Sequence, residues 1–285
     1  MYRTVPTPPT GTRLARPVAG LMDVDMNDSA TLIVGGSSGI GFATAERLVQ
    51  LAKPVTIIGR NAAKLDAATD RLRAKWAGDG SAHLAVTSER VDLQDRASVL
   101  RLVERLAARE FPYAGLVNAA GVFAPKPFLD HTLEDYDRYH ELNRATFQLT
   151  QAVADRMRES GSGTIVNVGS MWAHQAVKAT PSSAYSMAKA ALHALTQHLA
   201  MELADDGIRV NAVAPAVVRT PIYGAFVPEE ELEQVLSGFD AFHPIGRTGT
   251  AADVAATIGF LLSDESSWVT GAVWNIDGGV MAGRN

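Results

Sequence analysis

A short apolar run followed directly by a glycine-rich turn constrains the fold of this chain more than any other stretch. Thr31–Val34 has the pattern of a buried strand, and it leads through Gly35-Gly-Ser-Ser-Gly39-Ile-Gly41 into a helical pattern from Phe42 to Leu51. Glycines at such a turn let the backbone approach a phosphate closely, and the following helix N-terminus presents free N–H groups. The spacing is Gly-x-x-x-Gly-x-Gly, not the common Gly-x-Gly-x-x-Gly dinucleotide fingerprint. A nucleotide site and a plain turn are both open interpretations at this point.

The same alternation of apolar runs and helical patterns continues along the chain. Six further runs have the pattern of strands: Val55–Ile58, about Leu84–Val91, Ala114–Val117, Gly163–Ser170, Ile208–Ala214 and Ala272–Ile276. Strands separated by helices of this kind predict an α/β fold, with a parallel sheet and helices on both faces. Ligands of such sheets bind beyond the carboxyl ends of the strands. Four loops are therefore predicted to line one crevice: Gly35–Gly41, Arg60, Asp92 and Asn118–Gly121.

The end of the second strand bears on which dinucleotide would bind. An acid there would accept hydrogen bonds from the adenine-ribose hydroxyls, whereas an arginine would pair with a 2′-phosphate. The sequence has Gly59-Arg60-Asn61 and no acid, which favours NADP(H) over NAD(H). A solvated arginine at a helix start is the alternative if no nucleotide binds. Asp92 could accept a hydrogen bond from an adenine amino group, or simply cap the helix through Leu106.

Tyr185 and Lys189 lie four residues apart at the start of an Ala-rich stretch. On a helix both side chains leave the same face, one turn apart. A cation lowers the pKa of a phenol, which is about 10 in free Tyr. Bringing it near 7 requires roughly 4 kcal/mol, more than we expect from Lys189 alone, and an oxidised nicotinamide ring would be a second cation. Taken alone, the pair also fits an ordinary surface i,i+4 contact.

Two polar residues precede this pair. Thr132, with Asp135 three residues on, predicts the start of a long helix through Met157 that contains Asn143. Ser170 stands at the end of the predicted fifth strand, fifteen residues before Tyr185.

Together these motifs resemble the short-chain dehydrogenase/reductase family in its common single-domain form, from about Thr31 to Gly279. The matching motifs are the glycine loop, the Asn-x-Ala-Gly turn, Ser…Tyr-x-x-x-Lys, Ile-Arg-Val-Asn-x-Val-x-Pro and the terminal Asp-Gly-Gly. The resemblance implies a Rossmann-type, doubly wound, seven-stranded parallel sheet with NAD(P) across its carboxyl edge. It also implies a homotetramer or homodimer that acts on a small-molecule carbonyl or alcohol.

The resemblance implies roles for particular residues. Tyr185 would be the general acid/base, Lys189 would lower its pKa and hold the nicotinamide ribose, and Ser170 would bind the substrate oxygen. Asn143 would hold a water that links Lys189 to solvent. The implied cofactor-binding residues, besides Tyr185 and Lys189, are Gly35, Ser37, Ser38, Gly39, Ile40, Arg60, Asn61, Asp92, Leu93, Asn118, Ala119, Gly121, Pro215, Val218 and Thr220. The implied substrate-pocket residues are Met171, Trp172, Tyr223 and Phe226.

Four features depart from the family pattern, and none removes a reacting group. Three are single residues, namely Val34 before the first glycine, Ala119 in the Asn-x-Ala-Gly turn and Ala216 after Pro215. The fourth is a longer Ser170–Tyr185 interval. It suggests an altered pocket wall built from Met171, Trp172, His174 and Lys178.

Residues 1–28, rich in Pro and Thr, are expected to be a disordered tail, and residues 29–285 a single NAD(P)-binding domain. By family position, residues of about 220–244 form a lid over the substrate. Its aromatic residues favour an apolar substrate portion or simply pack the lid down, and its glutamates from Glu229 to Glu233 are expected on a solvated helix face. His193 and His198 are five apart and do not share a helix face, so no metal site is expected.

Bulk composition excludes several other classes. Net charge is −5 with no basic block, which argues against nucleic acid or anionic membrane as partners. No apolar run approaches the ~20 residues of a membrane span. The absence of cysteine excludes disulfides and thiol chemistry and fits a cytoplasmic protein.

The sequence therefore favours an NADP(H)-dependent oxidoreductase that interconverts a carbonyl and a secondary alcohol by hydride transfer. An NAD-preferring alcohol dehydrogenase of the same fold is one alternative, and a non-catalytic nucleotide-sensing protein is another, because fold alone does not fix function.

Overall fold

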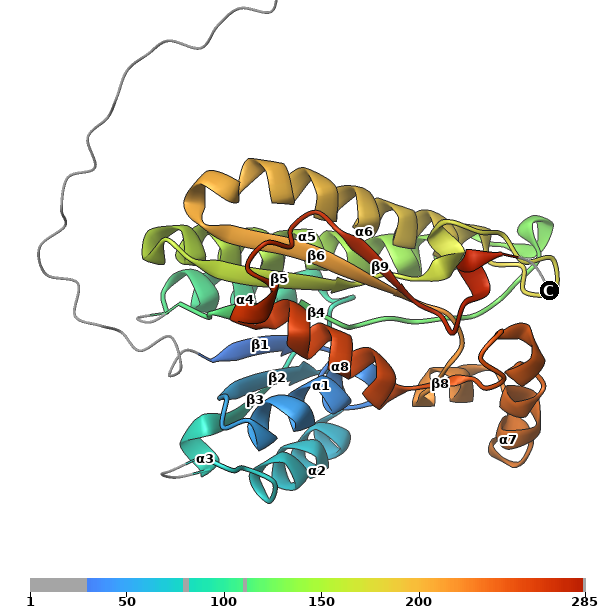
Figure 1. Ribbon diagram of the computed structural model, residues 1–285, viewed down its shortest axis with the longest axis horizontal. Helices are drawn as coiled ribbons and strands as arrows, with labels where there is room; N and C mark the ends of the chain where they lie inside the picture. Colours follow the sequence, from blue (N-terminus) through green and yellow to red (C-terminus); the bar gives the residue numbers. More distant parts are fainter. Residues whose placement is uncertain (1–29, 79–81, 110–111, 284–285) are drawn as a thin grey trace, which may run out of the picture.

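The structure is a computed structural model that describes residues 30–78, 82–109 and 112–283. The predicted disordered tail, residues 1–28, lies outside the described residues. Seven strands form one sheet in the order β3-β2-β1-β4-β5-β6-β9, and all neighbours pair in parallel (Figure 1). This confirms the predicted doubly wound parallel sheet. The strands are β1 Thr31–Val34, β2 Val55–Gly59, β3 Val86–Arg90, β4 Gly115–Asn118, β5 Gly163–Val168, β6 Ile208–Pro215 and β9 Val273–Ile276.

Helices connect the strands. They are α1 Gly39–Gln50, α2 Ala62–Arg73, α3 Ala82–Ala85, α4 Arg96–Ala107, α5 Leu133–Ser160, α6 Ser183–Glu202, α7 Glu229–Ser237 and α8 Ala251–Leu262. Short 3-10 turns are η1 Phe128–Asp130, η2 Met171–Ala173, η3 Ala204–Asp206, η4 Pro221–Ala225, η5 Asp240–Phe242, η6 Asp264–Ser266 and η7 Val280–Ala282. A separate two-stranded pair, β7 Val218–Arg219 and β8 Gly249–Thr250, was not anticipated from the sequence.

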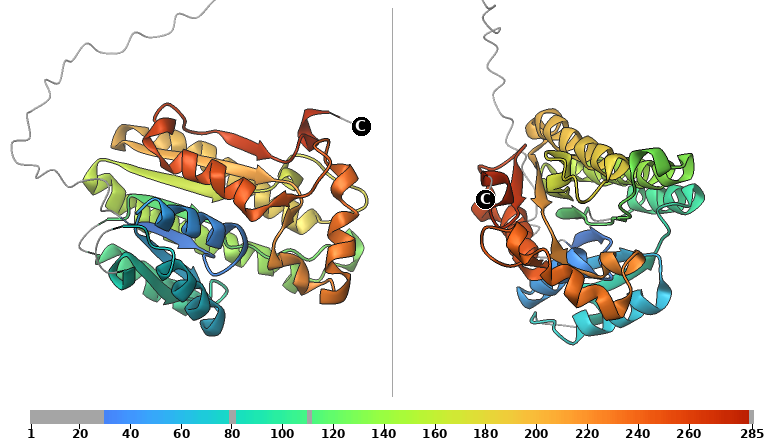
Figure 2. Two further views of the ribbon diagram at one scale, coloured as in Figure 1. Left: turned by 60° about the horizontal axis from the view of Figure 1, so that its bottom comes forward. Right: turned by 90° about the vertical axis from the view of Figure 1, so that its right-hand side faces the viewer.

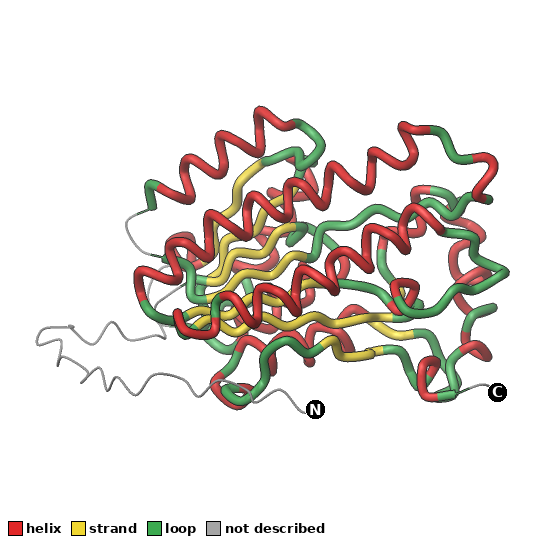
Figure 3. The backbone as a smooth tube through the Cα atoms, turned by 90° about the horizontal axis from the view of Figure 1, so that it is seen from above, coloured by secondary structure: helices red, strands yellow, loops and turns green. Residues whose placement is uncertain are grey.

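Helices cover both faces of the sheet, as Figures 2 and 3 show from two directions. On β1, Leu32 and Val34 pack with α4 and α5, whereas Ile33 between them packs with α1 and α8. Successive strand residues point to opposite faces, so a strand covered on both sides must be apolar throughout. This explains why the strands of this chain are continuous apolar runs rather than alternating ones.

Local signals set most element boundaries. Thr132 and Asp135 form the predicted capping box at the start of α5. The predicted strand start at Leu84 is wrong, because residues 82–85 make a helical turn and β3 begins at Val86. The alternative role of Asp92 as a helix cap is also wrong, since the carboxylate of Asp95 accepts the N–H of Ala97 and caps α4.

The predicted lid lies beyond the carboxyl ends of the strands, where Figure 1 shows α7. Leu236 of α7 is buried and packs with Met171 and Trp172 of η2, while Leu232 and Phe242 pack around them. Within the part of the chain that the structure describes, no helix has the length and apolarity needed to cross a membrane.

Candidate active site

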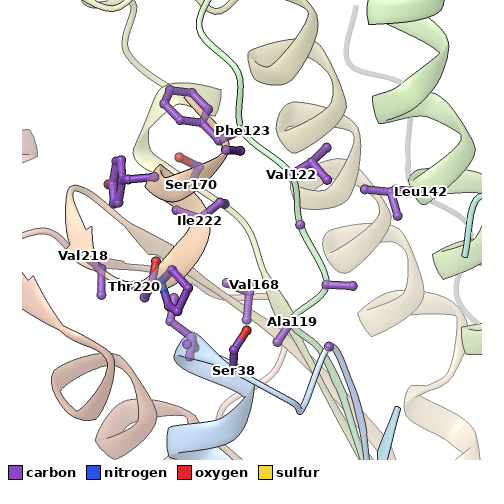
Figure 4. A pocket seen from close by; sticks show the side chains of 18 of the residues that line it. Ser38, Ala119, Val122, Phe123, Leu142, Val168, Ser170, Val218, Thr220 and Ile222 are labelled. Carbon is purple, nitrogen blue, oxygen red and sulfur yellow. The ribbon is translucent and has the colours of Figure 1, made fainter. Parts of the chain in front are cut away.

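One pocket, with a cavity volume of about 450 Å³, runs across the carboxyl ends of the strands (Figure 4). It brings together most residues that the sequence singles out. These are Gly35, Ser37, Ser38, Gly39, Ile40, Arg60, Asn61, Asp92, Leu93, Ala119, Gly121, Ser170, Trp172, Tyr185, Lys189, Pro215, Val218, Thr220 and Tyr223. Ser38 and Ala119 lie toward one end of the view in Figure 4, and Ser170 and Phe123 toward the other.

The first end, which we call the cofactor end, is built on the glycine turn and the start of α1. Gly35 has φ +84°, and a Cβ there would lie 2.6 Å from the backbone nitrogen of Ala120, so glycine is required for this close approach. The Ser38 side chain makes no capping hydrogen bond among the described residues, and the first turn of α1 contains no acid. The pocket therefore faces unsatisfied backbone N–H groups and the positive end of a helix dipole, which suits a pyrophosphate.

Polar side chains extend the cofactor end along β2 and β3. Arg60 is exposed, and its guanidinium makes no hydrogen bond or ion pair with any residue that the structure describes. The Asn61 side chain accepts the N–H of Lys64 at 3.0 Å and caps α2, while the Asp92 carboxylate accepts the N–H of Gln94 at 3.0 Å. These donors and acceptors suit the polar groups of a dinucleotide.

The other end, which we call the reaction end, contains the predicted catalytic side chains. Tyr185 and Lys189 lie one turn apart on α6, and Ser170 follows β5 directly. The Lys189 Nζ donates to the backbone oxygen of Val168 at 2.7 Å. The Ser170 Oγ accepts the N–H of Trp172 at 3.3 Å, which leaves its hydroxyl hydrogen to donate into the pocket.

Burial controls the ionisation of this pair. It raises the pKa of the Tyr185 phenol well above its usual value, the interaction with the Ser170 side chain opposes this, and nearby Tyr223 adds to it. Burial also lowers the pKa of Lys189 to about 8. In the chain alone the net shift of the Tyr185 pKa is therefore upward, because burial is its largest cause, and the lowering of that pKa by Lys189 stays a prediction.

Asn143 lies on α5 beside this pair. Its side-chain amide donates to the backbone oxygen of Ala188 at 2.9 Å, which ties α5 to α6. Asn143 and Lys189 both line a second cavity of about 20 Å³, together with Tyr139 and Thr146. That volume is about what one water molecule requires.

Several residues lie elsewhere than the sequence predicts. Met171 is fully buried beneath the pocket rather than lining it, since it packs into the cluster that supports the lid. His174 and Lys178 are both exposed and do not line the pocket, and the ring of His174 stacks against His193 at 4.6 Å. The Asn118 side chain is buried, because its amide donates to Thr150 and Asn167 below the large pocket.

The lid residues divide into two groups. Tyr223 lines the pocket, whereas Phe226 does not line it and instead packs against the rings of Phe123 and Tyr223. The glutamates of α7 are exposed as expected, although Glu233 also forms an ion pair with Arg219 at 2.6 Å.

Sequence reasoning missed Phe123, Thr180 and Ile222, which line the reaction end. Phe123 comes two residues after Gly121, the last residue of the Asn-x-Ala-Gly turn. Its nearness to that turn is the sequence signal that could have identified it. It also missed His193, which is one turn beyond Lys189 on α6 and whose Nε2 accepts the Ser170 N–H at 3.4 Å. Among the described residues there is no cluster of three or more His, Asp or Glu that could hold a metal ion.

Comparisons with known proteins show the family to which the chain belongs. A family model described as enoyl-(acyl carrier protein) reductase matches residues 34–281. The chain is 31% identical over 255 residues to a 3α-hydroxysteroid dehydrogenase of Mediterraneibacter gnavus, covering 89% of this chain and 97% of that protein. It is 32% identical to a cyclopentanol dehydrogenase of Comamonas, covering 90% and 98%.

A solved structure from Beutenbergia cavernae, with a provisional assignment as an NAD(P)-dependent gluconate 5-dehydrogenase and NADP bound at low occupancy, is also similar. It matches with a TM-score of 0.79 and 31% identity over 90% of this chain and 97% of that one. The chain therefore belongs to the short-chain dehydrogenase/reductase family of oxidoreductases.

Proposed function

We propose that this protein is an NADP(H)-dependent oxidoreductase that interconverts a carbonyl and a secondary alcohol, with Tyr185 as the general acid/base. The observation that carries the proposal is that Ser170, Tyr185 and Lys189 line one end of the same pocket whose other end holds the open α1 N-terminus and Arg60. The names of two relatives, a 3α-hydroxysteroid dehydrogenase and a cyclopentanol dehydrogenase, support a hydroxyl-bearing carbon as the reacting centre.

The cofactor end would hold the dinucleotide. The turn residues Gly35, Gly39 and Ile40 would bind the pyrophosphate, and Ser37 with Arg60 the 2′-phosphate. Asp92 and Leu93 would bracket the adenine, and the backbone of Asn118 to Gly121 would follow the ribose. Pro215, Val218 and Thr220 would face the nicotinamide.

The preference for NADP(H) has support from the space around Gly59. A Cβ at Gly59 would lie 2.9 Å from the Oγ of Ser37 and 3.1 Å from its Cβ. An acid at this position, which an NAD-preferring site would use, therefore requires Ser37 to move. The exposed guanidinium of Arg60, which has no partner among the described residues, would by contrast pair with a 2′-phosphate.

The chemistry at the reaction end follows from where charge develops. When bound, the reduced cofactor would supply a hydride to the carbonyl carbon. The substrate oxygen gains negative charge as this happens, and Tyr185 donates its proton to that oxygen while Ser170 donates a hydrogen bond to it. Burial keeps Tyr185 protonated, which prepares it as an acid for the reductive direction.

Lys189 and Asn143 would resupply the proton. Lys189 lines both the large pocket and the cavity of about 20 Å³, so it connects the two. We place one water molecule in that cavity. Asn143 would hold this water, which would pass protons between Lys189 and solvent. The lowered pKa of Lys189, about 8, suits a group that exchanges protons near neutral pH.

We also propose a homotetramer. Large apolar side chains are exposed in two parts of the chain: Phe147 on α5 and Met187 on α6, 51% and 54% exposed, and Trp268, which precedes the edge strand β9 by five residues and is 99% exposed. A tetramer built from two-fold contacts requires two different self-complementary surfaces, and we assign one to each of these places. Light scattering that gives the mass of a monomer would contradict this proposal.

The test of the catalytic proposal is Tyr185→Phe. It removes the proton donor and keeps the ring, so turnover with NADPH and a ketone should fall by at least about 1000-fold. Affinity for NADPH, measured by fluorescence titration, should change by less than about threefold. Tyr136→Phe is the matched control, since Tyr136 lies on the surface of α5, stacked on His140. Turnover by Tyr185→Phe at the rate of this control would rule out the role of Tyr185.

A further inference from the structure

The reaction end differs from the cofactor end in the kind of side chain that lines it. Its walls are aromatic and aliphatic: Val122, Phe123, Trp172, Val217, Ile222 and Tyr223. Figure 4 shows Phe123 and Ile222 in the same part of the pocket as Ser170. Three separate connections supply these residues, which follow β4, β5 and β6.

Phe123 is the centre of an aromatic cluster around the reacting group. Its ring packs edge-on against Tyr185 with centroids 4.8 Å apart, and it lies 6.2 Å from the ring of Trp172. On its other side it meets Phe226 at 5.6 Å, and Phe226 meets Tyr223 at 6.0 Å. Because each ring is held by another, this wall has a fixed shape that an apolar body can pack against.

Charge is distributed unevenly along the pocket. The charged side chains that line it are Arg60, Lys64, Asp92 and Lys189, among the residues that the structure describes. The first three lie in the cofactor end: Arg60 directly follows β2, Lys64 is in the first turn of α2, and Asp92 follows β3. Only Lys189 is near Tyr185, and its Nζ already donates to the Val168 oxygen at 2.7 Å.

The neutral polar groups of the reaction end are also few. The Ser170 hydroxyl and the Tyr185 phenol are committed to the reacting oxygen. Burial raises the pKa of Tyr223 to about 12, so its hydroxyl remains uncharged at neutral pH. It therefore offers a substrate no charge to pair with. A carboxylate or phosphate carried into this space would lose its hydration, and the single cation there, Lys189, already donates to the Val168 oxygen.

Resting on the proposed function, we propose that the carbonyl substrate is an uncharged ketone whose body is apolar and packs against Phe123, Trp172 and Tyr223. Phe123 is then a specificity-determining residue. Substrates that carry a carboxylate or a phosphate near the carbonyl are excluded, because the described pocket offers them no cation besides the one that serves Tyr185.

A matched set of three ring ketones tests the charge argument: 4-methylcyclohexanone, methyl 4-oxocyclohexanecarboxylate and the free 4-oxocyclohexanecarboxylate. Oxidation of NADPH is followed with the full-length protein, and NADPH binding is titrated separately. The two neutral ketones should agree in kcat/KM within about tenfold, and the carboxylate should be at least about 100-fold lower, because it is buried unpaired. The ester controls for size, since it differs from the carboxylate mainly in charge.

The outcomes separate this inference from the proposed function. Equal or faster reduction of the carboxylate would overturn the inference and leave the oxidoreductase intact. Failure to reduce either neutral ketone while NADPH binds would also overturn it. Failure to bind NADPH at all would overturn the proposed function itself.

Two phenylalanine variants test the role of Phe123. Phe123→Leu should raise KM for the neutral ketones by about tenfold or more, since the ring that packs on the substrate is lost, with little change in NADPH affinity. Phe128→Leu is the control, because Phe128 is 73% exposed on η1 and does not line the pocket. Equal KM values for the two variants would contradict the assignment.

Discussion

The two ends of the pocket are built in different ways. The cofactor end is made mainly of backbone and of the turns that directly follow β1, β2, β3 and β4, and its charged groups are Arg60, Lys64 and Asp92. The reaction end is made of side chains from longer connections, and apart from Ser170, Tyr185 and Lys189 it is largely apolar. A turn between a strand and a helix has few possible shapes, so it suits a part that must bind one constant molecule. Long connections carry variable side chains and suit the choice of substrate.

The first prediction compares the pH dependence of oxidation and reduction at the reaction end. Oxidation of an alcohol requires Tyr185 as a base, whereas reduction requires it as an acid. Because burial raises the pKa of Tyr185, the phenol stays protonated through neutral pH. We expect kcat/KM for oxidation to rise about tenfold per pH unit from pH 6 to 8, about 100-fold in all, and kcat/KM for reduction to change by less than about threefold.

Initial rates in both directions across that range check this prediction. A reductive rate that falls as steeply as the oxidative rate rises would show that the phenol titrates near pH 7. In that case the bound dinucleotide, and not the buried chain, would set its ionisation.

The second prediction sharpens the contrast at the cofactor end. Arg60→Ala should weaken NADPH binding by about 10- to 100-fold, the value of a charge-assisted pair with a phosphate, and leave NADH binding unchanged within about threefold. Equilibrium titrations of both nucleotides measure this, and NADH serves as the internal control. Equal weakening of both would show that Arg60 acts on the fold of the loop and not on a phosphate.

The third prediction concerns His193, whose Nε2 accepts the Ser170 N–H behind the reaction end, and the pH dependence of the free energy of unfolding. His193 is 6% exposed, and burial, with smaller contributions from His174 and Lys189, lowers its pKa to about 4. Between that value and the usual 6.5, the unfolded chain binds a proton that the folded chain does not. The free energy of unfolding therefore falls as the pH falls through this window, by about 2 kcal/mol between pH 7.5 and pH 5 from this group.

Urea denaturation of wild type and His193→Gln at pH 7.5 and pH 5 measures that loss. The variant should lose about 2 kcal/mol less than the wild type over the interval. His198→Gln, at an exposed position on the same helix, should behave as the wild type. Identical losses in all three proteins would mean that His193 takes up its proton in the folded state.

The cofactor end could be predicted from the sequence more fully than the reaction end. Most strand positions, the capping box at Thr132 and the glycine turn could be predicted, because each depends on neighbours in the chain. The placement of Met171 and His174 could not, because η2 turns Met171 into the core and leaves His174 on the surface, and no periodic pattern describes that turn. Phe123 escaped for the same reason, since its partners Tyr185, Trp172 and Phe226 are far away in sequence.

The electrostatics of the pair could not be predicted for a different reason. The spacing of Tyr185 and Lys189 correctly places a cation beside a phenol, but it carries no information on how deeply the two are buried. In the folded chain burial raises the pKa of the phenol and lowers that of the amine, so each departs from its usual value in the direction opposite to that expected from the pair.

The measurement that tests the central claim most directly is an equilibrium titration of the full-length protein with NADPH and, separately, with NADH. The account predicts saturable binding of both, with NADPH clearly tighter, because the open α1 N-terminus receives a pyrophosphate and Arg60 a 2′-phosphate. Tighter binding of NADH would discard the role given to Arg60 and retain the enzyme. Binding of neither would contradict the account as a whole, since every role given to the pocket depends on a dinucleotide lying across those loops.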